Sequence, residues 1–350
     1  MEHRFPYYDT GRDKQVNAGK NEVILRTENL TKRYGEIQAL TNLNLEIHRG
    51  EIFGYIGHNG AGKTTTIRIL AGLLKPTDGK ATIAGVDVVS KRKQVKLLVG
   101  YMPDNFGVYE QMRVWEYLDF FGAAFKIPKS KRRERIDEVM EMTDSYDLRD
   151  RFVDTLSRGM KQRVGIARTL MHDPEVLLLD EPASGLDPRA RVHMRQLLRR
   201  LADTGKTLLV SSHILPELAA ICDSIGILHM GILRTAGPLQ EVLSSLRRHR
   251  LIEVKLLGDV NKAIELISQN AQCENIERSV EVDNVVNFHF NGNDEELAEL
   301  TDKLVRADLR VVTVREVPLT LEEAYMTVSG FEGEIEQAPQ QQNEAADTTG

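Results

Sequence analysis

Residues 57–64 read Gly57-His58-Asn59-Gly60-Ala61-Gly62-Lys63-Thr64 and fit the pattern GxxxxGK[ST] at every fixed position. The apolar run before them, residues 51–56, predicts a buried strand, and the pattern of residues 65–74 predicts a helix. A glycine loop between a strand and a helix turns backbone N–H groups toward an anion at the helix N-terminus. The sequence therefore predicts a phosphate-binding loop within an α/β fold.

The residue types in this loop indicate a nucleoside triphosphate as the ligand. Lys63 would supply a positive charge for the β- and γ-phosphate oxygens, and Thr64 a hydroxyl for Mg²⁺. The alternative, a glycine-rich turn that binds nothing, does not account for the flanking strand and helix. We predict that the nucleotide is held by Gly57, His58, Asn59, Gly60, Ala61, Gly62, Lys63, Thr64 and Thr65.

An acidic pair, Asp180 and Glu181, ends the apolar run at residues 176–179. Many buried parallel strands end in an acidic residue, so this run alone is weak support for a site. Together with the glycine loop it indicates hydrolysis, because strand-end carboxylates are suited to Mg²⁺ and water. Asp180 is expected to hold Mg²⁺ through water, and Glu181 is expected to orient or deprotonate the water that attacks the γ-phosphate.

A third motif lies between these two, where residues 156–163 read Leu156-Ser157-Arg158-Gly159-Met160-Lys161-Gln162-Arg163. This stretch resembles the signature of ATP-binding cassette (ABC) ATPases, usually LSGGQ followed by a basic helix. Further landmarks of that family follow the expected order: Tyr34, residues 184–187, and His213 directly after a predicted strand at 207–212. The resemblance covers roughly residues 23–237, and the ordered set of motifs is far more specific than any one of them.

The resemblance implies a role for each landmark. Tyr34 would stack on adenine, His213 would be the switch histidine, and Asp187 would belong to the D-loop. Ser157 and the Gly159 backbone N–H would bind the ATP of a facing subunit. Two ATP molecules would then be enclosed in a head-to-tail dimer with a second copy or a paralogous ATPase. That dimer would drive a multi-spanning membrane permease from the cytoplasmic face of the cell membrane.

Three positions depart from the family pattern. Asp104 stands where a glutamine is expected, Arg158 replaces the first signature glycine, and Met160 replaces the signature glutamine. Asp104 can still meet Mg²⁺ or its water, but it adds negative charge beside a triphosphate. A guanidinium at position 158 would attract the γ-phosphate of the facing subunit's ATP. Because the loop lysine, both strand-end carboxylates and the switch histidine are present, we expect an active ATPase.

The composition indicates a chain of more than one domain. Its 350 residues carry a formal net charge of −6 and give a sequence pI of about 5.9, so no global field favours nucleic acid. Residues 1–21 lack the apolar region of a secretory signal. No run approaches the ~20 apolar residues of a spanning helix. We expect a soluble intracellular protein that meets a membrane only through a partner.

Four regions follow from the sequence pattern. They are a mobile arm at residues 1–21, a doubly wound P-loop cassette at 22–246 with a helical subdomain at about 105–170, an α+β unit at 251–329 and a disordered tail at 330–350. The third region reads as strands at 251–257, 276–282, 285–290 and 309–317 with helices at 260–269 and 294–306. This order, βαββαβ, predicts a ferredoxin-like domain. It ends at residues 318–325, which are similar to the ending of ATPases of prokaryotic drug, antibiotic and lipid exporters.

Other chemistry-bearing residues receive ordinary interpretations. Six of the ten residues in 126–135 are cationic, and we favour a solvated helix face over lipid or nucleic-acid contact. Cys222 and Cys273 lack metal-ligand spacing. We interpret the remaining histidines as surface or loop residues, namely His48, His58, His172, His193, His229 and His249.

Two alternatives to an exporter subunit stay open from the sequence. One is a soluble cassette ATPase that acts on ribosomes or DNA, and it is disfavoured by the single cassette and the acidic balance. The other is a nucleotide-gated regulator in which Asp104 and Arg158 permit binding without turnover.

Overall fold

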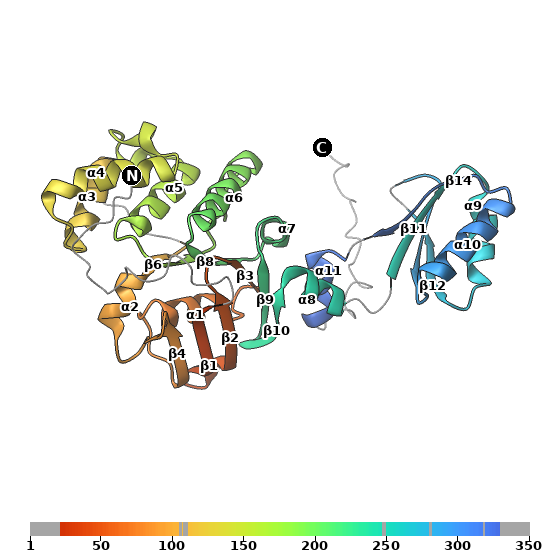
Figure 1. Cartoon of the computed structure of the whole chain (residues 1–350), viewed down its shortest axis with the longest axis horizontal. Coiled ribbons are helices and arrows are strands. Elements are labelled where there is room, and N and C mark those ends of the chain that lie inside the picture. The colour runs from red at the N-terminus through yellow and green to blue at the C-terminus, as the bar shows by residue number, and fades with distance from the viewer. Residues whose placement is uncertain are drawn as a thin grey trace, which may run out of the picture. The chain divides into compact units, whose positions relative to one another are not determined.

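The computed structural model describes residues 22–104, 107, 111–246, 250–279, 282–317 and 319–329. The chain divides into two compact units, Met1–Leu239 and Gln240–Gly350 (Figure 1). The boundary lies after Leu239, the first residue of helix α8 (Leu239–Leu246), so nearly all of α8 belongs to the second unit. The sequence pattern instead predicts a boundary after residue 246. The expected arm at 1–21 and tail at 330–350 lie outside the described residues.

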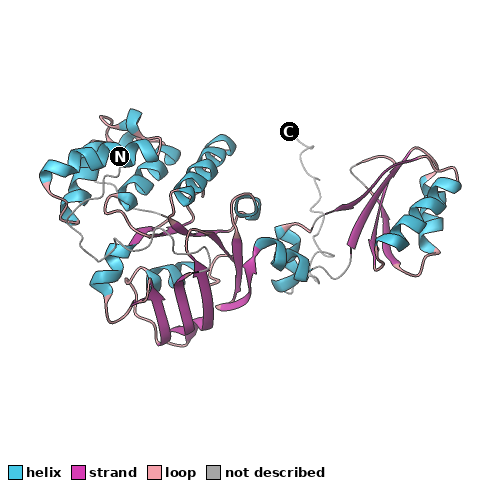
Figure 2. Cartoon of the chain, in the orientation of Figure 1, coloured by secondary structure: helices cyan, strands magenta, loops and turns pink. Residues whose placement is uncertain are grey.

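A six-stranded sheet forms the centre of the first unit, and five of its strands are parallel (Figure 2). In spatial order the strands are β10 (Ile232–Pro238), β9 (Ser224–His229), β3 (Ile52–Ile56), β8 (Thr207–Ser212), β7 (Val176–Asp180) and β6 (Val99–Met102). Every residue of β3, β7 and β8 is buried, as expected for parallel strands covered on both faces. The predicted α/β fold class is confirmed.

A second, antiparallel sheet is a feature that the strand-and-helix alternation of the sequence does not predict. In spatial order its strands are β2 (Ile37–His48), β1 (Val23–Tyr34), β4 (Asp78–Ile83) and β5 (Val86–Asp87). Burial alternates along β2, where Leu43, Leu45 and Ile47 are buried and the residues between them are exposed. This alternation shows that one face of the sheet packs on the core and the other meets solvent.

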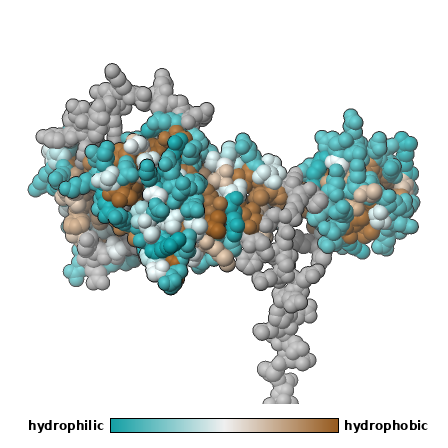
Figure 3. Space-filling model, turned by 90° about the horizontal axis from the view of Figure 1, so that it is seen from below, coloured by the Kyte–Doolittle hydropathy of each residue, from teal (hydrophilic) through white to brown (hydrophobic). Residues whose placement is uncertain are grey.

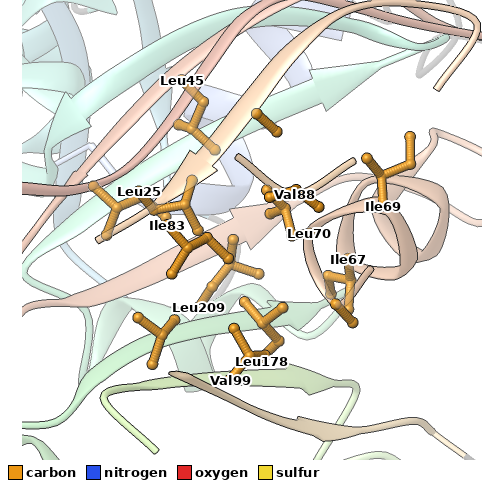
Figure 4. Packing of buried hydrophobic residues seen from close by; sticks show 14 of the residues in the cluster. Leu25, Leu45, Ile67, Ile69, Leu70, Ile83, Val88, Val99, Leu178 and Leu209 are labelled. Atoms are coloured by element: carbon orange, nitrogen blue, oxygen red, sulfur yellow. The ribbon is translucent and has the colours of Figure 1, made fainter. Parts of the chain in front are cut away.

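Helix α1 (Lys63–Leu70) lies between the two sheets (Figure 4). Its side chains Ile67 and Leu70 join one buried cluster with Leu25 of the antiparallel sheet and Leu178 of the parallel sheet. The glycine loop leads directly into α1. Burial of the helix therefore fixes the loop against the end of β3.

Helices dominate the described part of residues 105–170, in line with the sequence pattern. They are α3 (Val114–Ala124), α4 (Lys129–Met142) and α5 (Arg158–Leu170), with 3-10 turns at Tyr146–Leu148 and Val153–Thr155. The other helices of the first unit are α2 (Arg92–Leu98), α6 (Pro188–Asp203) and α7 (Leu215–Ala219). Val114, Tyr117 and Leu118 are buried, so the apolar stripe of α3 is core.

The cationic cluster on α4 is partly structural and only partly a solvated face. Arg135 is 4% exposed and donates to the carbonyl oxygens of Met171 and Leu170 at the end of α5. Arg132 pairs with Asp119 of α3 at 2.7 Å. Arg135 thus satisfies the last carbonyl groups of α5, as a cation at a helix C-terminus does. Together, Arg135 and Arg132 link α4 to α5 and to α3.

The second unit contains a four-stranded antiparallel sheet with the order expected of a ferredoxin-like topology. In spatial order the strands are β12 (Cys273–Arg278), β13 (Val285–Phe290), β11 (Arg250–Leu256) and β14 (Val311–Val317). Helices α9 (Val260–Ser268) and α10 (Asp294–Arg306) supply Ala263, Ile267 and Leu300 to its core. Strand β12 begins three residues before the predicted start at 276. A further helix, α11 (Leu321–Ser329), follows β14.

None of the helices in the described ranges is long and apolar enough to cross a membrane. On the face that Figure 3 shows, apolar side chains lie in patches among polar ones over both units.

His172 lies outside the helices and strands, as expected, but its ring is packed against the protein. It follows α5, and its ring stacks on Phe125 with 3.9 Å between centroids. Its Nε2 lies 3.0 Å from the Val99 carbonyl oxygen. Burial lowers the pKa of His172 to about 4, with the hydrogen bond to Val99 acting in the opposite direction. The folded protein therefore binds this proton less readily than the unfolded chain does.

Acidification is expected to destabilise the first unit through His172. Its folded pKa lies below the unfolded value, so the stability it contributes is complete above about pH 6.5 and is lost as the pH falls toward 4. Between pH 7.5 and 5 this corresponds to about 2 kcal/mol of unfolding free energy. Urea unfolding at both values measures it. The His172→Gln variant should lose less stability than the wild type over this interval, and an equal loss would contradict the assignment.

Candidate functional site

Three parallel strands end at the same edge of the central sheet and place the predicted motifs together. Ile56 of β3 pairs with Ser212 of β8, and Ser211 pairs with Asp180 of β7. The glycine loop follows β3, Asp180 ends β7 with Glu181 directly after it, and His213 follows β8. Ligands of open α/β sheets bind at the carboxyl ends of the strands.

The backbone of the loop explains its glycines. Gly60 and Gly62 have φ of +85° and +111°, a region that residues with side chains rarely adopt. A Cβ on Gly57 would lie 2.6 Å from the Leu228 carbonyl oxygen, so only glycine fits there. Helix α1 begins at Lys63, and the N–H groups of its first turn have no partner within the helix. The start of α1 is therefore suited to an anion.

Lys63 lies at the centre of the site and is only 6% exposed. Its Nζ donates to the carbonyl oxygen of Gly57 and, at 3.3 Å, to that of His58. The same atom lies 3.5 Å from Oε1 of Glu181. The ammonium group thus stands where the glycine loop and the strand-end carboxylate meet.

Glu181 is held in an unusual backbone conformation. Its φ is +53°, in the left-handed region, and its N–H donates to the Ser211 carbonyl oxygen at 3.2 Å and to the Ser211 hydroxyl at 3.1 Å. Its Oε2 lies 2.8 Å from Nδ1 of His213. The two carboxylate oxygens of Glu181 are therefore directed at Lys63 and His213.

Ser211 is a residue that sequence reasoning missed. Its hydroxyl donates to Oδ1 of Asp180 at 2.7 Å, and Asp180 is 2% exposed. Together with its contacts to Glu181, this makes Ser211 the residue that orients both members of the acidic pair. Ser211 belongs to none of the motifs. The sequence shows only that it lies near the end of a predicted strand.

His229 was also missed, and its interpretation as a surface or loop residue was wrong. It ends β9 and is 6% exposed. Its ring lies 5.4 Å from that of His58 in the glycine loop, in an edge-to-face arrangement. Burial, followed by the charges of His58 and Arg234, lowers the pKa of His229. A neutral imidazole therefore supports the glycine loop from the neighbouring strand.

The remaining predicted residues lie at helix starts and at a strand end. Ser157 is the N-cap of α5, and its hydroxyl accepts a hydrogen bond from the Met160 N–H at 3.4 Å. Asp187 is the N-cap of α6, and its carboxylate accepts a hydrogen bond from the Ala190 N–H at 2.9 Å. A Cβ on Gly159 would lie 3.5 Å from the Ala190 Cβ, so the start of α5 packs on the start of α6. Tyr34 ends β1 and is 46% exposed.

Asp104 and Arg158, two of the departures from the family pattern, meet within one chain. Nη2 of Arg158 lies 3.5 Å from Oδ1 of Asp104 and 3.4 Å from Oγ of Ser184. From the sequence, Arg158 is expected to face the ATP of a facing subunit and, in a homodimer, to meet Asp104 across the interface. The structure adds a contact inside the subunit itself.

Comparison with known proteins agrees with these motifs. Residues 40–184 match the family model described as ABC transporter. The chain is 38% identical over 255 residues to the bacitracin transport ATP-binding protein BcrA of Bacillus licheniformis, an alignment that covers 73% of this chain and 81% of that protein. It belongs to the ABC transporter ATP-binding proteins. As a member of that family, the chain binds and hydrolyses ATP as a subunit of an ABC transporter.

Further relatives of this ABC ATPase support the assignment. The linearmycin resistance ATP-binding protein LnrL of Bacillus subtilis is 32% identical over 240 residues, which cover 69% of this chain and 77% of that protein. Among solved structures, cbiO1 of Clostridium perfringens, part of the transporter complex cbiONQ, has a TM-score of 0.59 and 28% identity. That likeness covers 71% of this chain and 96% of cbiO1.

Proposed function

We propose that this ABC ATPase powers export through a separate multi-spanning permease, by ATP-dependent head-to-tail dimerisation with a second ATPase subunit. The contacts among Lys63, Glu181 and His213 at one edge of the parallel sheet carry the proposal. Export is supported by the names of two relatives, a bacitracin transport protein and a linearmycin resistance protein. The sequence of residues 318–325 points the same way.

The nucleotide would lie along the glycine loop. Backbone N–H groups of residues 57–65 and the Lys63 ammonium would bind the phosphates. Tyr34 would stack on adenine, because its ring is exposed at the end of β1 and aromatic faces accept bases. Lys32 Nζ lies 4.9 Å from the Tyr34 ring centroid and adds positive charge beside that platform.

The oxygen donors at the sheet edge fit a hard divalent cation such as Mg²⁺. We infer that Thr64 and Asp180 would hold it, and that Asp104 would contact one of its bound waters, a role that an uncharged amide could also fill. Ser211 fixes the orientation of the Asp180 carboxylate through their 2.7 Å hydrogen bond. When bound, the cation would offset negative charge on the phosphate oxygens.

Hydrolysis would depend on Glu181. Its carboxylate would accept the proton of the attacking water or orient that water toward the γ-phosphate. His213 would hold the carboxylate in place through their 2.8 Å contact and respond to the γ-phosphate. Lys63 would stabilise negative charge on the phosphates as the bond to the leaving group breaks.

Dimerisation would couple hydrolysis to transport. Ser157 and the Gly159 N–H would bind the γ-phosphate held by the facing subunit, and Asp187 would lie in the same interface. The triphosphate would then join the two subunits, and its hydrolysis would release them. The permease would respond to this cycle at the cytoplasmic face of the membrane.

Capture of the transporter complex tests the proposed function. The Glu181→Gln variant, held with MgATP, is extracted from native membranes in detergent, and its partners are identified by mass spectrometry. A multi-spanning membrane protein should co-purify with it, and less of that protein should co-purify with a Lys63→Met variant. Recovery of ribosomes or DNA without a membrane protein would replace the proposal with a non-transport switch.

A further inference from the structure

The two charged departures from the family pattern form a contact that spans different parts of the subunit. Arg158 is the first residue of α5, and Asp104 follows the end of β6. Met102 of β6 pairs with Leu179 of β7, so Asp104 lies near the level of Glu181 at the carboxyl edge of the sheet. The Asp104–Arg158 contact therefore joins the signature helix to the edge that carries the proposed catalytic residues.

The contact extends to the loop that follows Glu181. Nη2 of Arg158 lies 3.4 Å from the Ser184 hydroxyl, and the Ser184 N–H donates to the Glu181 carbonyl oxygen at 3.1 Å. Gly185 has a φ of +65°, and a Cβ there would lie 2.8 Å from Cζ of Arg158. The guanidinium thus lies directly against the backbone of this loop, where glycine leaves space for it.

We propose that Arg158 is a positioning residue that neutralises Asp104 and links the start of α5 to the Glu181 loop within one subunit. This inference rests on the proposed function. The family's glutamine is uncharged, so Asp104 places an additional negative charge beside a triphosphate. A guanidinium 3.5 Å away offsets that charge. Asp104 and Arg158 together carry no net charge, like the uncharged glutamine that the family has at position 104.

Suppression of one substitution by another tests the neutralisation. The dissociation constant of a non-hydrolysable ATP analogue with Mg²⁺ is measured for the full chain. Arg158→Gln should weaken binding about fivefold, a change near the upper end of the interaction free energies found for partly exposed ion pairs. Adding Asp104→Asn to Arg158→Gln should restore affinity to within about twofold of the wild type, because the carboxylate that lost its guanidinium is then removed as well. Lys161→Gln, which removes a positive charge from the same helix, should leave affinity unchanged.

The catalytic rate separates positioning from charge. Arg158→Gln should lower kcat about fivefold, since its hydrogen bond to the Ser184 hydroxyl is lost. The double variant should regain affinity but keep the lowered kcat, a division that general loss of packing would not produce. A double variant that binds no better than Arg158→Gln, or a Lys161→Gln variant that weakens binding equally, would overturn the inference. A wild type that binds no analogue would overturn the proposed function as well.

Discussion

Replacing Glu181 with glutamine is expected to lower the ATPase rate of the assembled complex by about 10²–10⁴-fold, the range for loss of a general base. Glutamine keeps the size of the side chain and can still contact His213, but it cannot accept a proton from water. The wild-type carboxylate is held by contacts from two sides, 3.5 Å from Lys63 Nζ and 2.8 Å from His213 Nδ1. The loss should therefore appear in kcat, with little change in nucleotide affinity.

A matched carboxylate provides the control for this substitution. The side chain of Glu217 is 14% exposed, close to the 13% of Glu181. Glu217 also pairs with a cation, because its carboxylate lies 3.3 Å from Arg195. Glu217→Gln should leave kcat within about twofold of the wild type, because Glu217 lies outside the site. A decrease of less than tenfold for Glu181→Gln would exclude it as the general base.

Replacing Lys63 with methionine is expected to weaken MgATP binding by roughly 100-fold or more, because loss of one partner from a buried charge interaction costs about 2–5 kcal/mol. Methionine has nearly the same length but supplies neither charge nor donor. It would also leave the Glu181 carboxylate, 3.5 Å away, without this cation. Equilibrium titration with a fluorescent ATP analogue and Mg²⁺ measures the effect.

Lys206 offers the matched control for this second substitution. Its side chain is 15% exposed, compared with 6% for Lys63, and it pairs with Asp173 at 2.6 Å away from the glycine loop. Lys206→Met should keep nucleotide affinity even if it lowers the unfolding temperature. If Lys63→Met bound MgATP as tightly as the wild type does, the glycine loop would not be the phosphate site.

The strands and helices were largely predictable where local pattern and burial agree. Strand β8 matches the predicted residues 207–212, and β13 and α10 of the second unit match their predicted bounds. The antiparallel sheet of β1 and β2 was not predicted, because alternation of strands and helices along the chain does not reveal that two long neighbouring strands pair with each other. The start of β12 was misplaced because Cys273 and Glu274 carry no strong strand preference.

The chemistry of the site was decided by the sequence itself. The proposed phosphate-binding loop, metal-binding hydroxyl and strand-end acidic pair are recognised by residue type and short spacing, at Gly57–Thr64 and Asp180–Glu181. The order of the ABC landmarks along the chain is enough to indicate the family. Three-dimensional packing was not needed to identify these residues.

Only the tertiary structure decided which side chains support them. Ser211 contacts Asp180 from 31 positions away, His229 packs its ring on His58, and Arg158 reaches Asp104 across 54 positions. Such contacts depend on strand register and on how α5 packs against the sheet edge, and neither leaves a local pattern in the sequence. Residue type determines what a group can do, whereas the fold determines which group stands within hydrogen-bonding distance of it.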